Sequence, residues 1–161
     1  MNAHKANRWL TLGANVGVLF GILLLVYELA QNREMIQSQT RSEVSRQVSD
    51  RLQLMASDSE LASIWRRARD GEELSVDEET QYFLLIQATL RDWENIHYQY
   101  RKGLFEDAEF DAEKAAWQRV LSGDQLFHKY WCALRDNFSP DFSAEINESI
   151  AAGICEAKND L

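Results

Sequence analysis

The feature that most constrains the fold of this chain is an apolar run of 21 residues near the N-terminus, from Trp9 to Leu29. As an α-helix this run would rise about 1.5 Å per residue and extend over roughly 30 Å, the thickness of a bilayer's hydrocarbon core. The core of a small soluble domain does not need so long a run. The sequence therefore predicts a membrane-spanning helix over residues 9–30, after a short tail over residues 1–8.

A cleaved signal peptide is the alternative interpretation of this segment, because Lys5 and Arg8 form a basic start before the apolar stretch. Cleavage requires small residues before the cut, whereas Glu28 and Leu29 stand directly before Ala30. The exit from the apolar run thus favours a helix that is retained as an anchor.

Three glycines in the run, Gly13, Gly17 and Gly21, stand at four-residue spacing. Such glycines fall on one helix face, where a missing side chain lets a second helix approach closely. Asn15 adds an amide at membrane depth, which would seek a hydrogen-bonding partner. These four residues are the predicted helix-packing site, although glycine is also common in membrane helices that do not associate.

The rest of the chain reads as helical throughout. Aromatic residues make up 11% of the sequence, which is unlike disorder, and Pro140 is the single proline. No Gly or Pro occurs between Ile22 and Asp70, so the anchor can continue as a juxtamembrane helix over residues 31–57. Its apolar positions recur at three- and four-residue spacing. They are Val44, Val48, Leu52 and Met55.

Capping signals divide residues 58–161 into further helices. Ser57 or Asp58 can cap a short helix that carries Leu61, Ile64, Trp65 and Ala68. Ser75 and Glu78 form a capping box that opens the longest helix, and Gly103 ends it. Further starts lie near Asp107, at Asp124 and at Ser139–Pro140, and the last helix is expected to reach Ile154. The predicted fold class is all-α: a single N-terminal transmembrane helix continuing into an antiparallel helical bundle.

The charge of the bundle argues against nucleic acid as a partner. Residues 71–161 carry eight basic and nineteen acidic side chains, and such a domain repels phosphates. The short basic run from Arg66 to Arg69 is better explained as the last turn of a helix that ends at Gly71, where cations offset the helix dipole.

Little in the sequence points to catalysis. Glu94 and His97 form a Glu-x-x-His pair, but di-iron bundles need two such pairs, and the nearest second one is Gln125 with His128. We therefore expect no metal, no cofactor and no catalytic residues. A pocket lined by Tyr82, Trp93, Glu94, His97 and Tyr100 is the alternative site, and polar residues packed beside the apolar stripe are the simpler explanation of the same pattern.

The two cysteines bear on the compartment. If the last two helices form a hairpin that turns near Ser139, Cys132 and Cys155 lie on the order of 13 Å apart along the axis, too far for a disulfide. Free thiols favour a bundle on the cytoplasmic side of the membrane. The basic residues do not decide the orientation, because Lys5 and Arg8 on one flank are balanced by arginines on the other.

The layout resembles a functionally uncharacterised family of bacterial proteins with one N-terminal membrane helix and a small helical domain. Phe110 stands where that likeness leads us to expect a tryptophan. The resemblance implies this architecture and a bacterial inner membrane, and it implies no activity. The residues that carry it are Gln31, Asn32, Leu61, Trp65, Arg66, Arg67, Leu74, Glu94, Asn95, Tyr98, Gln99, Tyr100, Gly103, Leu104, Trp117, Trp131, Phe138, Ser139, Pro140 and Phe142.

Two functions are consistent with these features. The first is an interaction or assembly module, whose anchor associates with itself or docks to a larger membrane complex. The second is a membrane-tethered sensor domain that binds a small molecule or a metal. The lipid bilayer and a homo-oligomer or larger membrane complex are the expected partners.

Overall fold

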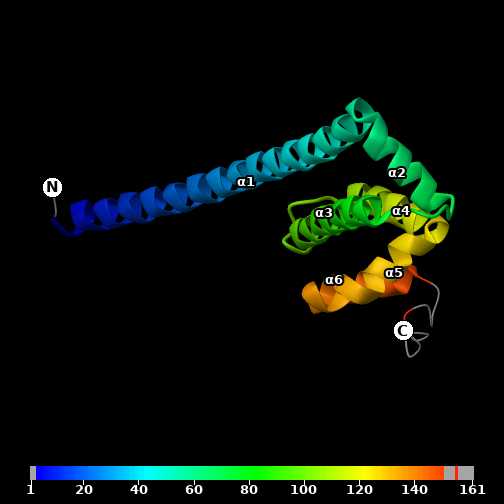
Figure 1. The fold of residues 1–161 in the computed structure, drawn as a ribbon. Coiled ribbons are helices and arrows are strands. Elements are labelled where there is room, and N and C mark those ends of the chain that lie inside the picture. Colours follow the sequence, from blue (N-terminus) through cyan, green and yellow to red (C-terminus); the bar gives the residue numbers. More distant parts are fainter. Residues whose placement is uncertain (1–2, 151–154, 156–161) are drawn as a thin grey trace. The chain divides into compact units, whose positions relative to one another are not determined.

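The computed structural model describes residues 3–150 and 155, with side chains from Asn7 onward. It divides into two compact units, of which the first ends at Gln39 and the second begins at Thr40. The described residues form six α-helices and no β-strand, which confirms the predicted all-α class (Figure 1). The elements are α1 (Ala3–Ser57), α2 (Ser59–Arg69), α3 (Val76–Arg101), α4 (Asp107–Gly123), α5 (Gln125–Leu134), a 3₁₀ helix (Arg135–Asn137) and α6 (Pro140–Ser149).

The first unit consists of the N-terminal part of α1. It contains a helix that is long and apolar enough to span a membrane, and the side chains of its most apolar stretch are exposed. The helix continues without a break to Ser57, so the predicted membrane and juxtamembrane segments are parts of one helix of 55 residues.

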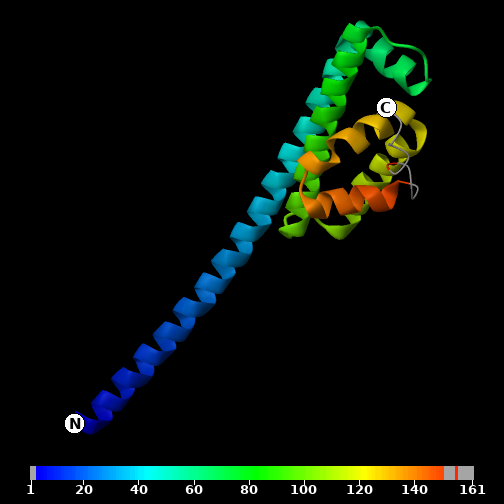
Figure 2. The same ribbon diagram turned by 60° about the horizontal axis from the view of Figure 1, so that its bottom comes forward.

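In the second unit α3 is the central element, since it contacts α2, α4, α5 and α6. Figure 2 shows the shorter helices gathered beside it. Aromatic side chains fill the space between them. The Trp93 ring lies between those of Trp117 and Phe127, with ring centroids 5.3 and 5.4 Å away. A core of stacked large rings buries much apolar area per residue, which suits a domain of this size.

The helix ends follow most of the predicted capping signals. Asp58 caps α2 by accepting hydrogen bonds from the backbone N–H groups of Glu60 and Leu61. The Ser75–Glu78 capping box opens α3, and Gly103 follows the end of α3 with a φ of 69°. The left-handed region is open to glycine without a steric cost, so this residue lets the chain reverse direction. Ser139 precedes α6 as predicted, but its side chain makes no capping hydrogen bond.

The basic run lies in the last turn of α2, as predicted. Arg66 forms ion pairs with Asp70 and Glu72, and Arg67 pairs with Glu78. Arg66 and Arg67 are therefore paired with acidic side chains of the same chain.

The apolar stripe predicted for residues 31–57, the C-terminal part of α1, is wrong at one position. Val44 is 4% exposed and Val48 and Met55 are half-buried, as expected, but Leu52 is 59% exposed. Arg51 faces the bundle in its place and forms an ion pair with Asp92 of α3. A helix period of 3.6 allows position 51 or 52 on this face, and the acidic partner on α3 selects the arginine.

The prediction of two free thiols is also wrong, because Cys132 and Cys155 form a disulfide with their Cα atoms 5.3 Å apart. The expected separation assumed that α6 continues to Ile154, which lies outside the described residues. The structure instead ends α6 at Ser149, and Ile150 has extended backbone angles. Because α6 ends before Cys155, the axial separation of the two cysteines that the prediction assumed does not arise, and Cys155 lies beside α5. The reason for placing the bundle in the cytoplasm is thereby lost.

Candidate functional site

The three glycines of α1 leave an open face on the helix. A Cβ atom added at Gly13, Gly17 or Gly21 would meet nothing within 4 Å. Within its own unit this face therefore has no neighbour, and a second helix could approach its backbone closely. Glycines at membrane depth allow such an approach at no cost in side-chain packing.

Asn15 does not share this face. Successive residues of an α-helix are rotated by about 100° around its axis. Asn15 is two residues from Gly13 and two from Gly17, so its side chain points about 200° away from each of them. Its side chain is exposed, and the described residues give it no hydrogen-bond partner. The predicted helix-packing site therefore consists of two features on opposite sides of one helix.

Three of the five predicted pocket residues are buried inside the bundle, and two of them, Tyr82 and Trp93, take part in its aromatic packing. Tyr82 is fully buried, and its hydroxyl donates a hydrogen bond to Oδ2 of Asp124. Burial, and then this hydrogen bond, raise the pKa of Tyr82 far above its usual value. Trp93 is 5% exposed and stacks on its aromatic neighbours. Both side chains serve the packing of α3 against α4 and α5.

Glu94 and Tyr100 also make internal contacts. Glu94 accepts hydrogen bonds from the Ser139 backbone N–H at 2.7 Å and from Arg91 at 2.7 Å. Burial raises the pKa of Glu94, but these hydrogen bonds outweigh it and lower the pKa overall. Glu94 thus ties α3 to the start of α6. The Tyr100 ring stacks on Phe110, with centroids 4.0 Å apart.

His97 lies in a small polar cluster inside the bundle. It is 5% exposed, its ring lies near those of Phe110 and Phe142, and Nε2 is 3.9 Å from Oε2 of Glu145. Glu145 itself forms an ion pair with Lys114. Burial lowers the pKa of His97, whereas Glu145 opposes this shift. The cluster joins α3, α4 and α6, and a ligand pocket at these residues stays a prediction.

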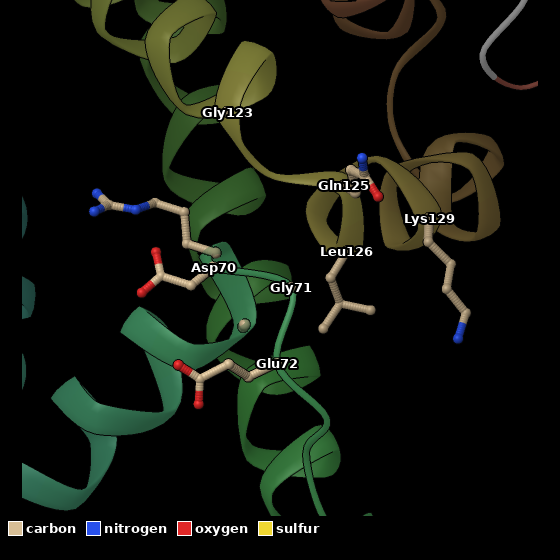
Figure 3. Close-up of a pocket in the computed structure, with 9 residues that line it drawn as sticks. Asp70, Gly71, Glu72, Gly123, Gln125, Leu126 and Lys129 are labelled. Carbon is tan, nitrogen blue, oxygen red and sulfur yellow. The ribbon is translucent and has the colours of Figure 1, made fainter.

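A surface hollow of about 620 Å³ lies where the α2–α3 connection meets the start of α5 (Figure 3). Figure 3 shows Leu126 and Lys129 extending from α5 on one side, and Asp70 and Glu72 on the other. The two carboxylates accept from Arg66, and Lys129 lies 3.4 Å from Glu79. Asp70, Glu72 and Lys129 are therefore paired within the protein, whereas Arg69, the remaining charged residue that lines the hollow, forms no ion pair with the described residues.

The described residues contain no group of three or more His, Cys, Asp or Glu side chains that could hold a metal ion. Sequence reasoning missed three charged residues that organise the bundle. Asp124 was predicted as a cap but not as the partner of Tyr82, and neither Arg51 nor Glu145 was singled out. All three interrupt or border an apolar stripe with a charge, which is the signal that could have found them.

Comparison with known proteins gives no relative. No protein-family profile, no curated protein and no solved structure matches the chain. The proposals on function therefore depend on the chain's own geometry.

Proposed function

We propose that this protein is a single-pass, membrane-anchored interaction or assembly module, whose α1 helix associates with other membrane helices. The observation that carries the proposal is the open glycine face at Gly13, Gly17 and Gly21 on a helix that is long and apolar enough to span a bilayer. In lipid the hydrophobic effect does not drive helices together, so close backbone packing at small residues supplies much of the attraction.

Asn15 supports an assembly with more than one contact per helix. An amide in the hydrocarbon region seeks a partner, and interhelical hydrogen bonds of this kind contribute about 0.6–2 kcal/mol. Because Asn15 lies on the side opposite the glycines, one partner helix cannot satisfy both features. A closed ring of several copies, or a place within a larger membrane complex, uses both faces, whereas a simple two-fold dimer uses only one.

The experiment is a membrane association assay on full-length protein in which Gly17 is replaced by leucine. The added side chain should hold a second helix away, so association should fall several-fold. The matched control is Val18→Leu, which adds one methylene about 100° away from the glycine face and should leave association unchanged. Asn15→Leu should weaken association independently of Gly17→Leu. Equal association of the Gly17→Leu and Val18→Leu variants would refute the glycine face as an interface.

The disulfide supports a bundle on the non-cytoplasmic side of the membrane. Disulfides form and persist in oxidising compartments and are rare in the cytoplasm. With the bundle outside, the tail that carries Lys5 and Arg8 faces the cytoplasm, and the arginines of the other flank balance it, so the disulfide alone supports this orientation. In a bacterium, as the family resemblance implies, this is a single-pass protein of the inner membrane with a periplasmic bundle. The oxidation state of the two cysteines in whole cells tests this orientation.

The alternative function, a small-molecule or metal sensor, gains no supporting contact from the described residues. Tyr82 and Trp93 are buried in aromatic packing, and Glu94 and His97 are engaged by side chains and backbone of the bundle. An assembly module is therefore the function that the geometry supports best.

A further inference from the structure

The outer part of α1, residues 40–57, makes an unusual contact with the bundle in the second unit. Val44 is the single residue of this segment that is fully buried, while Leu52 and Leu54 are more than half exposed. Val48 and Met55 are half-buried, and the polar part of the contact consists of two ion pairs. Arg51 pairs with Asp92 of α3, and Arg41 Nε lies 2.9 Å from Oε1 of Glu109 in α4.

Arg51 is the central group of this contact. Its side chain is 18% exposed and that of Asp92 is 30% exposed, whereas Arg41 is 69% exposed. Glu113 of α4 also interacts electrostatically with Arg51. Burial raises the pKa of both Asp92 and Glu113, and the charge of Arg51 opposes the shift in each case. The guanidinium of Arg51 thus pairs with Asp92 of α3 and also acts electrostatically on the partly buried Glu113 of α4.

The composition of the contact makes it separable from the folding of the bundle. The aromatic core around Trp93 and Trp117 contains no side chain of α1 other than Val44. Of residues 40–57, Val44 is buried and Val48 and Met55 are half-buried, so their apolar contact with the bundle is small beside the bundle's own aromatic core. A partly buried ion pair gains more from its low-polarity surroundings than an exposed pair, and removing one partner leaves an uncompensated charge.

We propose that residues 40–57 of α1 dock reversibly on α3 and α4, and that the ion pair of Arg51 with Asp92 is the contact that holds them. The bundle keeps its fold when the segment detaches, so the ion pair is a conformational device that couples the anchor helix to the bundle. This proposal stands apart from self-association, which depends on Gly13, Asn15, Gly17 and Gly21.

The test is hydrogen–deuterium exchange on the full-length protein in detergent micelles, comparing Arg51→Met with wild type. Methionine keeps an unbranched side chain and removes the charge. Backbone amides of residues 42–57 should exchange on the order of tenfold faster, because the loss of a partly buried pair costs more than that of an exposed one, while amides of α3 and α5 keep their protection. The matched control is Arg46→Met, since Arg46 is 62% exposed and pairs only within α1, with Glu43 and Asp50.

Swapping the charges of Arg51 and Asp92 is a second test. Arg51→Asp and Asp92→Arg should each increase exchange over residues 42–57, and the double variant should restore protection by re-forming the pair in the opposite sense. Two results would overturn the proposal. The first is equal exchange in the Arg51→Met and Arg46→Met variants, and the second is a parallel loss of protection in α3 and α5, which would show that the segment does not detach separately.

Discussion

Replacing Asp124 by alanine should destabilise the bundle by about 2–4 kcal/mol, because this one carboxylate serves two helices. Asp124 is 2% exposed. Its Oδ1 accepts from the Phe127 backbone N–H at 2.9 Å and so caps α5, while Oδ2 accepts from the hydroxyl of Tyr82 in α3. Loss of a cap costs about 1 kcal/mol, and a buried hydroxyl left without its partner costs a further 1–3 kcal/mol.

The prediction is measured by urea unfolding of the full chain in detergent, followed by tryptophan fluorescence. Asp58→Ala is the control, since Asp58 caps α2 in the same way but lies exposed and has only local hydrogen bonds. That variant should lose about 1 kcal/mol. Tyr82→Phe should lose about 1.5–3 kcal/mol, because it leaves a buried carboxylate oxygen without its donor.

The coupling between the two residues is the decisive quantity. If Tyr82 and Asp124 interact as described, the double variant should lose less than the sum of the single losses, by about 1–2 kcal/mol. Strict additivity, or a loss in Asp124→Ala no larger than in Asp58→Ala, would refute the claim that the buried hydrogen bond contributes beyond the cap.

Two further predictions concern His97 and the disulfide. Burial lowers the pKa of His97, so the unfolded chain takes up the proton first, and stability should fall as the pH drops from about 7.5 to about 5.5. His97→Gln should reduce this fall, and equal slopes in urea unfolding would contradict it. In whole cells that are lysed under thiol-blocking conditions, Cys132 and Cys155 should react with a mass-tagged maleimide only after reduction. Labelling without reductant would contradict a non-cytoplasmic bundle.

Local signals were enough to predict most of the fold. The capping residues Asp58, Ser75 and Asp124 fix the starts of α2, α3 and α5, and the left-handed Gly103 fixes the end of α3; these interactions span only a few residues. The apolar run of α1 likewise depends only on the length and composition of its own segment. Such features need no knowledge of what lies across the bundle.

Tertiary partners account for the errors. Arg51 takes the inward position because Asp92, 41 residues away in sequence, is there to accept it, and a helical wheel of α1 contains no such information. The end of α6 at Ser149 has no Gly or Pro to announce it, so the chain was expected to stay helical as far as Ile154. The wrong prediction of two free thiols followed from this missed helix end.

The candidate site was predictable only as a set of residue types. Four-residue spacing is enough to place Gly13, Gly17 and Gly21 on one face, and helical geometry alone puts Asn15 on the other. For Tyr82, Trp93 and His97 the sequence could not distinguish a pocket wall from a packed interior, because aromatic side chains at helical spacing suit both. Which of the two forms depends on how closely α4, α5 and α6 approach α3.

The Cys132–Cys155 bond closes a covalent ring that contains the whole of α6. This helix has ten residues, fewer than the roughly 12–15 that a lone helix needs to persist in water, so it depends on burying Phe142 and Ile146 against the other helices. When α6 lifts from the core, the ring keeps it within reach of α5 and favours its return. A protease that cuts the backbone inside the ring would leave two pieces still joined, and they would separate only after a reductant is added.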